Sequence, residues 1–109
     1  MLIAFHLENL LIELGYEVVG PAMRLQPALM IAQEEPLDLA LLDVNLAGEQ
    51  SFPVARALRQ RAIPFVFATG YGSGGVEAEF KGVVILQKPF EERALAEALA
   101  RTCRPGADD

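Results

Sequence analysis

The stretch LDLALLDV, residues 37–44, decides the fold, because it is almost uninterrupted in apolar residues between Asp38 and Asp43. A strand that is apolar on both faces is typical of a parallel β-sheet covered by helices on both sides. Pro36 precedes the stretch and Asp43 stands at its carboxyl end. The pattern therefore predicts a buried central strand that ends in a carboxylate, at the edge of the sheet where such folds bind ligands.

Strand and helix patterns alternate on both sides of this central strand. Such alternation at short spacing predicts an α/β fold with a parallel sheet between two layers of helices. The glycine-rich segment 70–82 leaves room only for a short helix. The predicted strands cover residues 17–22, 38–43, 63–69 and 83–87, and the predicted helices cover residues 3–14, 25–35, 51–58 and 88–101.

The composition excludes several classes of protein. A chain of 109 residues has room for one core. Its apolar runs are too short to span a bilayer, and the start lacks a secretory signal pattern, so we expect no membrane contact and a cytoplasmic location. The net charge of -6 disfavours binding to nucleic acid. The single cysteine, Cys103, excludes an internal disulfide and a cysteine metal cluster.

Three polar residues stand at the ends of successive predicted strands. Asp43, Thr69 and Lys88 place a carboxylate, a hydroxyl and an ammonium group at one edge of the sheet. This set suits phosphoryl chemistry, because a carboxylate can accept a phosphoryl group whose charge the ammonium compensates. Each residue also has a plainer interpretation. Asp43 and Thr69 are common turn residues, and a lysine is usually a solvated surface charge.

Three motifs resemble those of the receiver domains of bacterial two-component response regulators. They are LDLALLDVNLAG at residues 37–48, PFVFATGYG at 64–72 and QKPF at 87–90. The second is similar to the hallmark of the receiver subgroup named for its PFxFATGY stretch. The resemblance runs from Met1 to about Arg101. It implies a flavodoxin-like (CheY-like), doubly wound sheet of strand order 2-1-3-4-5.

The resemblance also implies roles for individual residues. Asp43 would be the phosphoacceptor, and a histidine kinase or a histidine phosphotransfer protein would be the donor. Lys88 would pair with the phosphoryl oxygens, and Thr69 would donate a hydrogen bond to the same group and move toward it. Asp43 and the backbone carbonyl of Asn45 would be ligands of Mg²⁺. Pro89 would follow a cis peptide bond that aims Lys88 at the site.

Two switch positions depart from the family pattern. Many receivers carry an aromatic residue three positions before the lysine, where this chain has Ile85. Tyr71, just after Thr69, is therefore the candidate that would replace the usual aromatic switch. The plainer interpretation of Tyr71 is a loop side chain that packs locally.

The start of the chain is the largest departure from the family. A receiver begins with a strand that ends in two acidic Mg²⁺ ligands, but the stripe Ile3, Leu7, Leu10, Leu11 and Leu14 predicts that this chain begins in a helix. The first strand and the acidic pair are thus predicted to be missing. In the alternative interpretation MLIAF is the strand, and Phe5 and His6 occupy the acidic positions. In both cases Mg²⁺ binding and phosphorylation should be weak, because Mg²⁺ needs hard oxygen ligands.

A missing first strand has a structural consequence. It would leave a gap between the strands at 17–22 and 38–43, and two unpaired strand edges. The gap would close by direct pairing of these two strands, or by a strand from another chain. In the second case the protein would be a homodimer.

These observations favour a stand-alone receiver domain over residues 1–101, followed by a disordered tail at 102–109. The domain would not be an enzyme, and would signal by binding a downstream protein after phosphorylation. One alternative is a pseudo-receiver, an interaction module that works without phosphorylation. A nucleotide-binding enzyme is a third, because Gly70, Gly72 and Gly75 satisfy G-x-G-x-x-G. That motif, however, should open a long helix, which this segment cannot hold.

Overall fold

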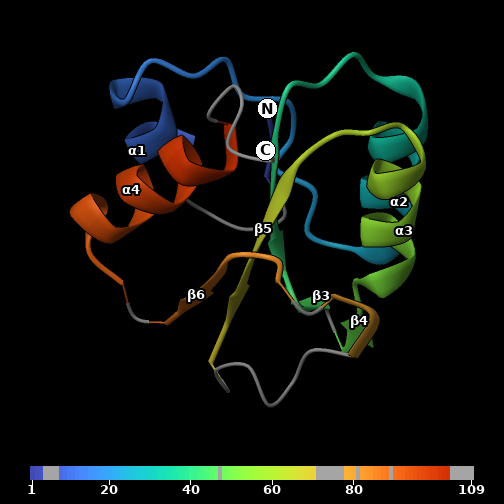
Figure 1. The fold of residues 1–109 in the computed structure, drawn as a ribbon. Coiled ribbons are helices and arrows are strands. Elements are labelled where there is room, and N and C mark those ends of the chain that lie inside the picture. Colours follow the sequence, from blue (N-terminus) through green and yellow to red (C-terminus); the bar gives the residue numbers. More distant parts are fainter. Residues whose placement is uncertain (4–7, 47, 71–77, 81, 89, 104–109) are drawn as a thin grey trace.

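The computed structural model describes residues 1–3, 8–46, 48–70, 78–80, 82–88 and 90–103. A parallel sheet lies between two helical layers (Figure 1). The strands are β1 (Leu2–Ile3), β2 (Ala40–Asp43), β3 (Asn45–Leu46), β4 (Glu49–Gln50), β5 (Phe65–Thr69) and β6 (Ile85–Gln87). The helices are α1 (Glu8–Glu13), α2 (Leu25–Glu34), α3 (Phe52–Gln60), the 3₁₀ helix η2 (Ala78–Phe80) and α4 (Glu92–Cys103).

The main sheet has the order β1-β2-β5-β6, and every pair in it is parallel. Residues 17–22 lie along the free side of β1, where Val19 forms a parallel bridge with Leu2. This segment is thus an edge that forms one bridge and further backbone hydrogen bonds with residues 1–3, but no full strand. From this edge the order is segment 17–22, β1, β2, β5, β6. If these five are numbered along the chain, the order is 2-1-3-4-5, as the family resemblance implies. The predicted α/β class and parallel sheet are confirmed.

The prediction that the first strand is missing is wrong for this structure, because Leu2 and Ile3 form β1. The Leu2 N–H donates to the Leu39 carbonyl at 3.2 Å, and the Val19 N–H donates to the Met1 carbonyl at 2.6 Å. Leu2 and Ile3 are both 0% exposed. A short apolar run fits a helix or a buried strand equally well by pattern, and here pairing on both sides with full burial favours the strand.

Two further expectations change with this strand. The first helix begins at Glu8 and not at Ile3, so the helical stripe through Ile3 was accidental. The gap between residues 17–22 and β2 does not exist, because β1 fills it. The two edges proposed for homodimer formation are therefore paired within one chain.

Gly20 shows how closely the edge segment approaches β1. Its φ is +104°, and a Cβ atom built on it would lie 3.0 Å from the Ala22 nitrogen and 3.1 Å from the Ile3 carbonyl oxygen. The Ala22 N–H donates to that same carbonyl at 2.8 Å. Glycine is favoured here for two reasons, the left-handed backbone and the lack of space.

The strands divide the core into two layers. On β5, Phe65 and Phe67 face the layer under α2 and α3, and Val66 and Ala68 face the layer under α1 and α4. This is the alternation that a strand imposes on successive side chains. Figure 1 shows the two helix pairs on opposite sides of the sheet. Because both faces are covered, the near-continuous apolar sequence of the central strands is explained.

The remaining segments agree in outline with the sequence prediction. Helix α3 begins at Phe52, within the predicted range 51–58, and the preceding Ser51 side chain makes no capping hydrogen bond there. In the glycine-rich segment the described part is the single turn η2, and residues 71–77 lie outside the description. Helix α4 continues through Thr102 and Cys103, which the sequence analysis placed in the disordered tail 102–109, and residues 104–109 lie outside the description. Within the described residues, no helix combines the length and apolarity needed to cross a membrane.

Candidate functional site

The candidate site lies where β2, β5 and β6 end. Asp43 is the last residue of β2, and Lys88 directly follows β6. The Lys88 Nζ atom lies 2.5 Å from the Asp43 Oδ2 atom. The side chains are 36% and 19% exposed, respectively, so solvent and a reaction partner can reach both. The structure thus brings together a carboxylate and an ammonium group that are 45 residues apart in sequence.

Thr69 is the last residue of β5 and lies at the same edge of the sheet. The register pairs Asp43 with Ala68 and Thr69 with Gln87. The Lys88 N–H donates to the Thr69 carbonyl at 2.8 Å. Thr69 is 2% exposed, so its side chain is held within the end of the sheet. Strand pairing, and not sequence proximity, therefore places Thr69 between the strands that carry Asp43 and Lys88.

A tight turn follows Asp43 and fixes its carboxylate. The Asn45 N–H donates to the Asp43 Oδ1 atom at 3.3 Å, and the Gly48 N–H donates to the Asn45 Oδ1 atom at 2.9 Å. The first bond is the local turn that aspartate commonly forms with the residue two positions on. The predicted turn at Asp43 is thus present together with the contact to Lys88. One oxygen bonds the turn and the other bonds Lys88.

Of the two switch positions that depart from the family pattern, Ile85 belongs to the described residues. It is half-buried, it lies opposite Phe67 in the register, and it packs against the core layer under α2 and α3. Tyr71 lies outside the description, as does Pro89 with its predicted cis peptide bond. The described cis bond is Gly20–Pro21.

The sequence analysis missed an aromatic cluster next to the site. Phe67 precedes Thr69 by two positions on the same strand, and its ring lies 5.9 Å from that of Phe52 and 5.4 Å from that of Phe80. Phe80 belongs to η2, which Arg56 of α3 holds through an ion pair with Glu79 at 2.8 Å. The signal in the sequence was the spacing of aromatic residues on β5, but their partners come from separate segments.

The donor set for Mg²⁺ is incomplete among the described residues. Asp43 offers a carboxylate, but no group of three or more His, Cys, Asp or Glu side chains in the described part could hold a metal ion. Residues 1–7 contain no Asp or Glu, and residues 4–7 lie outside the description. Mg²⁺ takes oxygen ligands, commonly one or two carboxylates with water or phosphate oxygens. The described side chains do not fit a metal site by themselves.

The geometry defines a class of domain. It is a doubly wound α/β domain with a carboxylate and an ammonium group in contact at the carboxyl ends of its parallel strands. That edge is where open α/β sheets bind their ligands.

Comparison with known proteins identifies the family. The family model described as "Response regulator receiver domain" matches residues 1–100, and the chain belongs to this family. The solved structure of SdrG from Sphingomonas melonis Fr1 is 42% identical, with a TM-score of 0.80 and 91% of each chain covered. The finer PFxFATGY subgroup stays a prediction, because the matching model describes the whole family.

Two curated relatives support a role in two-component signalling. The Positive alginate biosynthesis regulatory protein of Pseudomonas aeruginosa is 34% identical over 95 residues, covering 84% of this chain and 38% of that protein. The Sensory transduction protein LytT of Bacillus subtilis is 31% identical over 86 residues, covering 76% of this chain and 36% of that protein. The chain thus spans a little over a third of the length of these relatives.

Proposed function

We propose that this chain is a phosphoacceptor receiver domain of a cytoplasmic phosphorelay. It would take a phosphoryl group on Asp43 from the phosphohistidine of a histidine kinase or a phosphotransfer protein, and would then act by binding a protein partner. The observation that supports this most directly is the contact of 2.5 Å between the Lys88 Nζ atom and the Asp43 Oδ2 atom. A lysine in contact with Asp43 would provide a positive charge beside the negative oxygens of a phosphoryl group on that residue.

The transfer itself needs few groups. An Asp43 carboxylate oxygen attacks phosphorus, the bond between phosphorus and the histidine nitrogen breaks, and the electron pair stays on the imidazole. The product is an acyl phosphate. Lys88 then exchanges its contact with the carboxylate for contacts with phosphoryl oxygens, so its ammonium group keeps a charged partner throughout.

Thr69 would couple this chemistry to the rest of the domain. In this proposal its hydroxyl donates a hydrogen bond to the phosphoryl group, and the shift of its side chain disturbs neighbouring packing. Phe67 lies two positions earlier on the same strand, in contact with Phe80 of η2. This cluster, with Ile85 opposite Phe67 and Tyr71 as the candidate switch, is the route by which phosphorylation would reach a partner-binding surface.

A second candidate is a pseudo-receiver that binds its partner without phosphorylation. The observation that favours it is the incomplete Mg²⁺ donor set in the described part of the chain. A carboxylate held by Lys88 with no metal would be a poor acceptor, because nothing else shields its charge from the incoming phosphoryl group. In that case Asp43 and Lys88 would be a structural ion pair.

Labelling with phosphoramidate distinguishes the two candidates. This small donor carries the same phosphorus–nitrogen bond as phosphohistidine, and its transfer is followed by intact mass spectrometry with and without Mg²⁺. For a phosphoacceptor we expect a mass increase of one phosphoryl group that Asp43→Asn abolishes, with a slow rate if the metal site is weak. Unlabelled chain under all conditions, with an unchanged circular dichroism spectrum, would support the pseudo-receiver.

A further inference from the structure

Gln87 is the last residue of β6 and the register partner of Thr69 at the end of β5. The same register pairs Ile85 with Phe67, and both of these side chains belong to the layer under α2 and α3. Successive side chains of a strand alternate between the two faces of a sheet, so Thr69 and Gln87 lie on that same face. Neighbouring strands lie about 4.8 Å apart, so a glutamine side chain can reach a hydroxyl group on the next strand.

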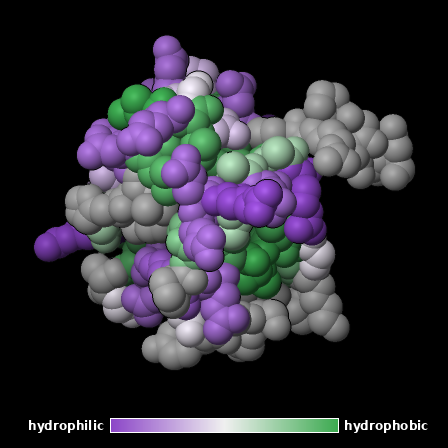
Figure 2. Space-filling view, turned by 90° about the vertical axis from the view of Figure 1, so that its left-hand side faces the viewer, coloured by the Kyte–Doolittle hydropathy of each residue, from purple (hydrophilic) through white to green (hydrophobic). Residues whose placement is uncertain are grey.

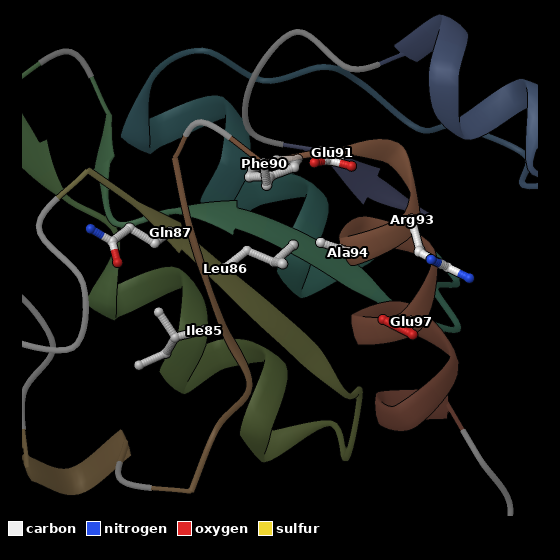
Figure 3. A pocket seen from close by; sticks show the side chains of 8 residues that line it. All are labelled: Ile85, Leu86, Gln87, Phe90, Glu91, Arg93, Ala94 and Glu97. Carbon is white, nitrogen blue, oxygen red and sulfur yellow. The ribbon is translucent and has the colours of Figure 1, made fainter.

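The side chain of Leu86, between Ile85 and Gln87 in β6, points to the other face of the sheet. It packs in the layer under α1 and α4, and Figure 2 shows the outer side of these two helices. In Figure 3, Ile85 and Gln87 lie on the opposite side of β6 from Leu86 and Ala94. The Gln87 carboxamide therefore points away from α4 and belongs to the face that holds Thr69.

The two neighbours of Thr69 in the sheet differ in polarity. On the β2 side, the register continues from the pair of Asp43 and Ala68 to Val44, which is 6% exposed and packs in the apolar core. On the β6 side lies Gln87, which is exposed. Of these two side chains, only that of Gln87 can form a hydrogen bond with the Thr69 hydroxyl. Because it is exposed, it can also change its rotamer without disturbing the core.

We propose that Gln87 is a positioning residue for Thr69, and that its amide N–H donates a hydrogen bond to the Thr69 hydroxyl oxygen once Asp43 is phosphorylated. This inference rests on the proposed phosphotransfer. A hydroxyl group has one hydrogen to donate and two lone pairs that accept. With Gln87 donating to a lone pair, the hydroxyl hydrogen is directed to the phosphoryl oxygen. In such a chain each hydrogen bond polarises the next, so the bond to the phosphoryl group is strengthened.

The first test compares single and double variants in the rate of labelling by phosphoramidate, followed by intact mass spectrometry. Gln87→Met keeps the length of the side chain but cannot donate a hydrogen bond, and it should slow labelling about fivefold, the net effect of one hydrogen bond. In the Thr69→Val background, which lacks the hydroxyl, the same substitution should have almost no effect. Residues that act through one another show such non-additivity. A glutamine that only packs would give equal effects in both backgrounds, and this result would overturn the proposal.

Gln87→Glu tests the direction of the hydrogen bond. An ionised carboxylate can only accept, so it would draw the Thr69 hydrogen away from the phosphoryl group. Labelling should therefore be slower than with Gln87→Met, and the part of this effect due to the hydrogen bond should disappear with Thr69→Val. The matched control is Gln60→Met at the exposed end of α3, which should leave the rate unchanged. Labelling of Gln87→Glu at the wild-type rate would contradict the proposed donor.

A spectroscopic measurement observes Gln87 directly. Its two side-chain N–H protons give their own NMR signals in isotopically labelled protein. We expect these signals to shift when Asp43 is phosphorylated and to stay in place in the phosphorylated Thr69→Val variant, while those of Gln60 stay unchanged in both. Phosphorylated wild-type protein with unchanged Gln87 signals would contradict this inference alone. If the wild-type chain is never labelled, the proposed function fails and this inference fails with it.

Discussion

Lys88 and Asp43 form an ion pair across the strand that separates them, with the Lys88 Nζ atom 2.5 Å from the Asp43 Oδ2 atom. β5 lies between β2 and β6, so both side chains reach over its carboxyl end. The backbone hydrogen bond from the Lys88 N–H to the Thr69 carbonyl fixes the position of the lysine backbone beside the end of β5. The pair is therefore a product of the sheet register, which brings residues from three strand ends to one edge of the sheet.

Replacing Lys88 should separate its chemical role from its structural role. We expect Lys88→Ala to change the free energy of unfolding by less than about 1 kcal/mol, because the pair is partly exposed. The rate of phosphoryl transfer to Asp43 should fall at least about tenfold, the loss typical when a group that stabilises transition-state charge is removed. Urea unfolding and the rate of labelling with phosphoramidate measure the two effects. A large loss of stability with unchanged labelling would indicate a purely structural lysine.

Shortening a buried side chain of β1 should lower the stability of the domain markedly, although the strand has only two residues. Leu2 is fully buried, so Leu2→Ala should lower the free energy of unfolding by about 2–5 kcal/mol. The matched control is Ile12→Ala on α1, whose side chain is 54% exposed and should matter by less than about 1 kcal/mol. Chemical denaturation of both variants provides the comparison. Equal, small effects would show that the start of the chain does not belong to the core.

Ser51 should tolerate the loss of its hydroxyl. Its Oγ atom is buried and has no hydrogen-bond partner among the described residues, and it does not cap α3. Replacing a serine that caps a helix by alanine typically lowers the free energy of unfolding by about 1 kcal/mol. Here we expect Ser51→Ala to be neutral or stabilising, because an unsatisfied buried hydroxyl is removed. A thermal unfolding midpoint that falls by several degrees would instead reveal a hydrogen bond to that hydroxyl.

Two glycines allow backbone strain to be separated from crowding. Gly15 and Gly20 both have positive φ, at +96° and +104°, but only Gly20 has neighbours within 4 Å of an added Cβ atom. Gly15→Ala should cost about 1 kcal/mol, for the left-handed backbone alone. Gly20→Ala should cost about 1–3 kcal/mol more, because its Cβ crowds the backbone of β1. Equal losses in urea unfolding would show that the edge segment can move away from β1.

The buried central strand and the residues at its edge were readable from the sequence. LDLALLDV is apolar at six of its eight positions, which is typical of a strand covered on both faces, and Asp43, Thr69 and Lys88 each stand near the end of an apolar run. The short segments were not readable in this way. Ile3 fits a helical stripe as well as a strand, and the pattern of a short apolar run cannot decide between the two.

The sequence by itself thus determined the α/β class, the strand ends and the identity of the polar residues there, because these follow from local periodicity. The tertiary structure decided what those residues touch. Pairing between distant segments made β1 a strand, brought the Lys88 ammonium to the Asp43 carboxylate, and gathered Phe52, Phe67 and Phe80 into one cluster. Such contacts depend on register and burial across the whole chain, which no local pattern of residues encodes.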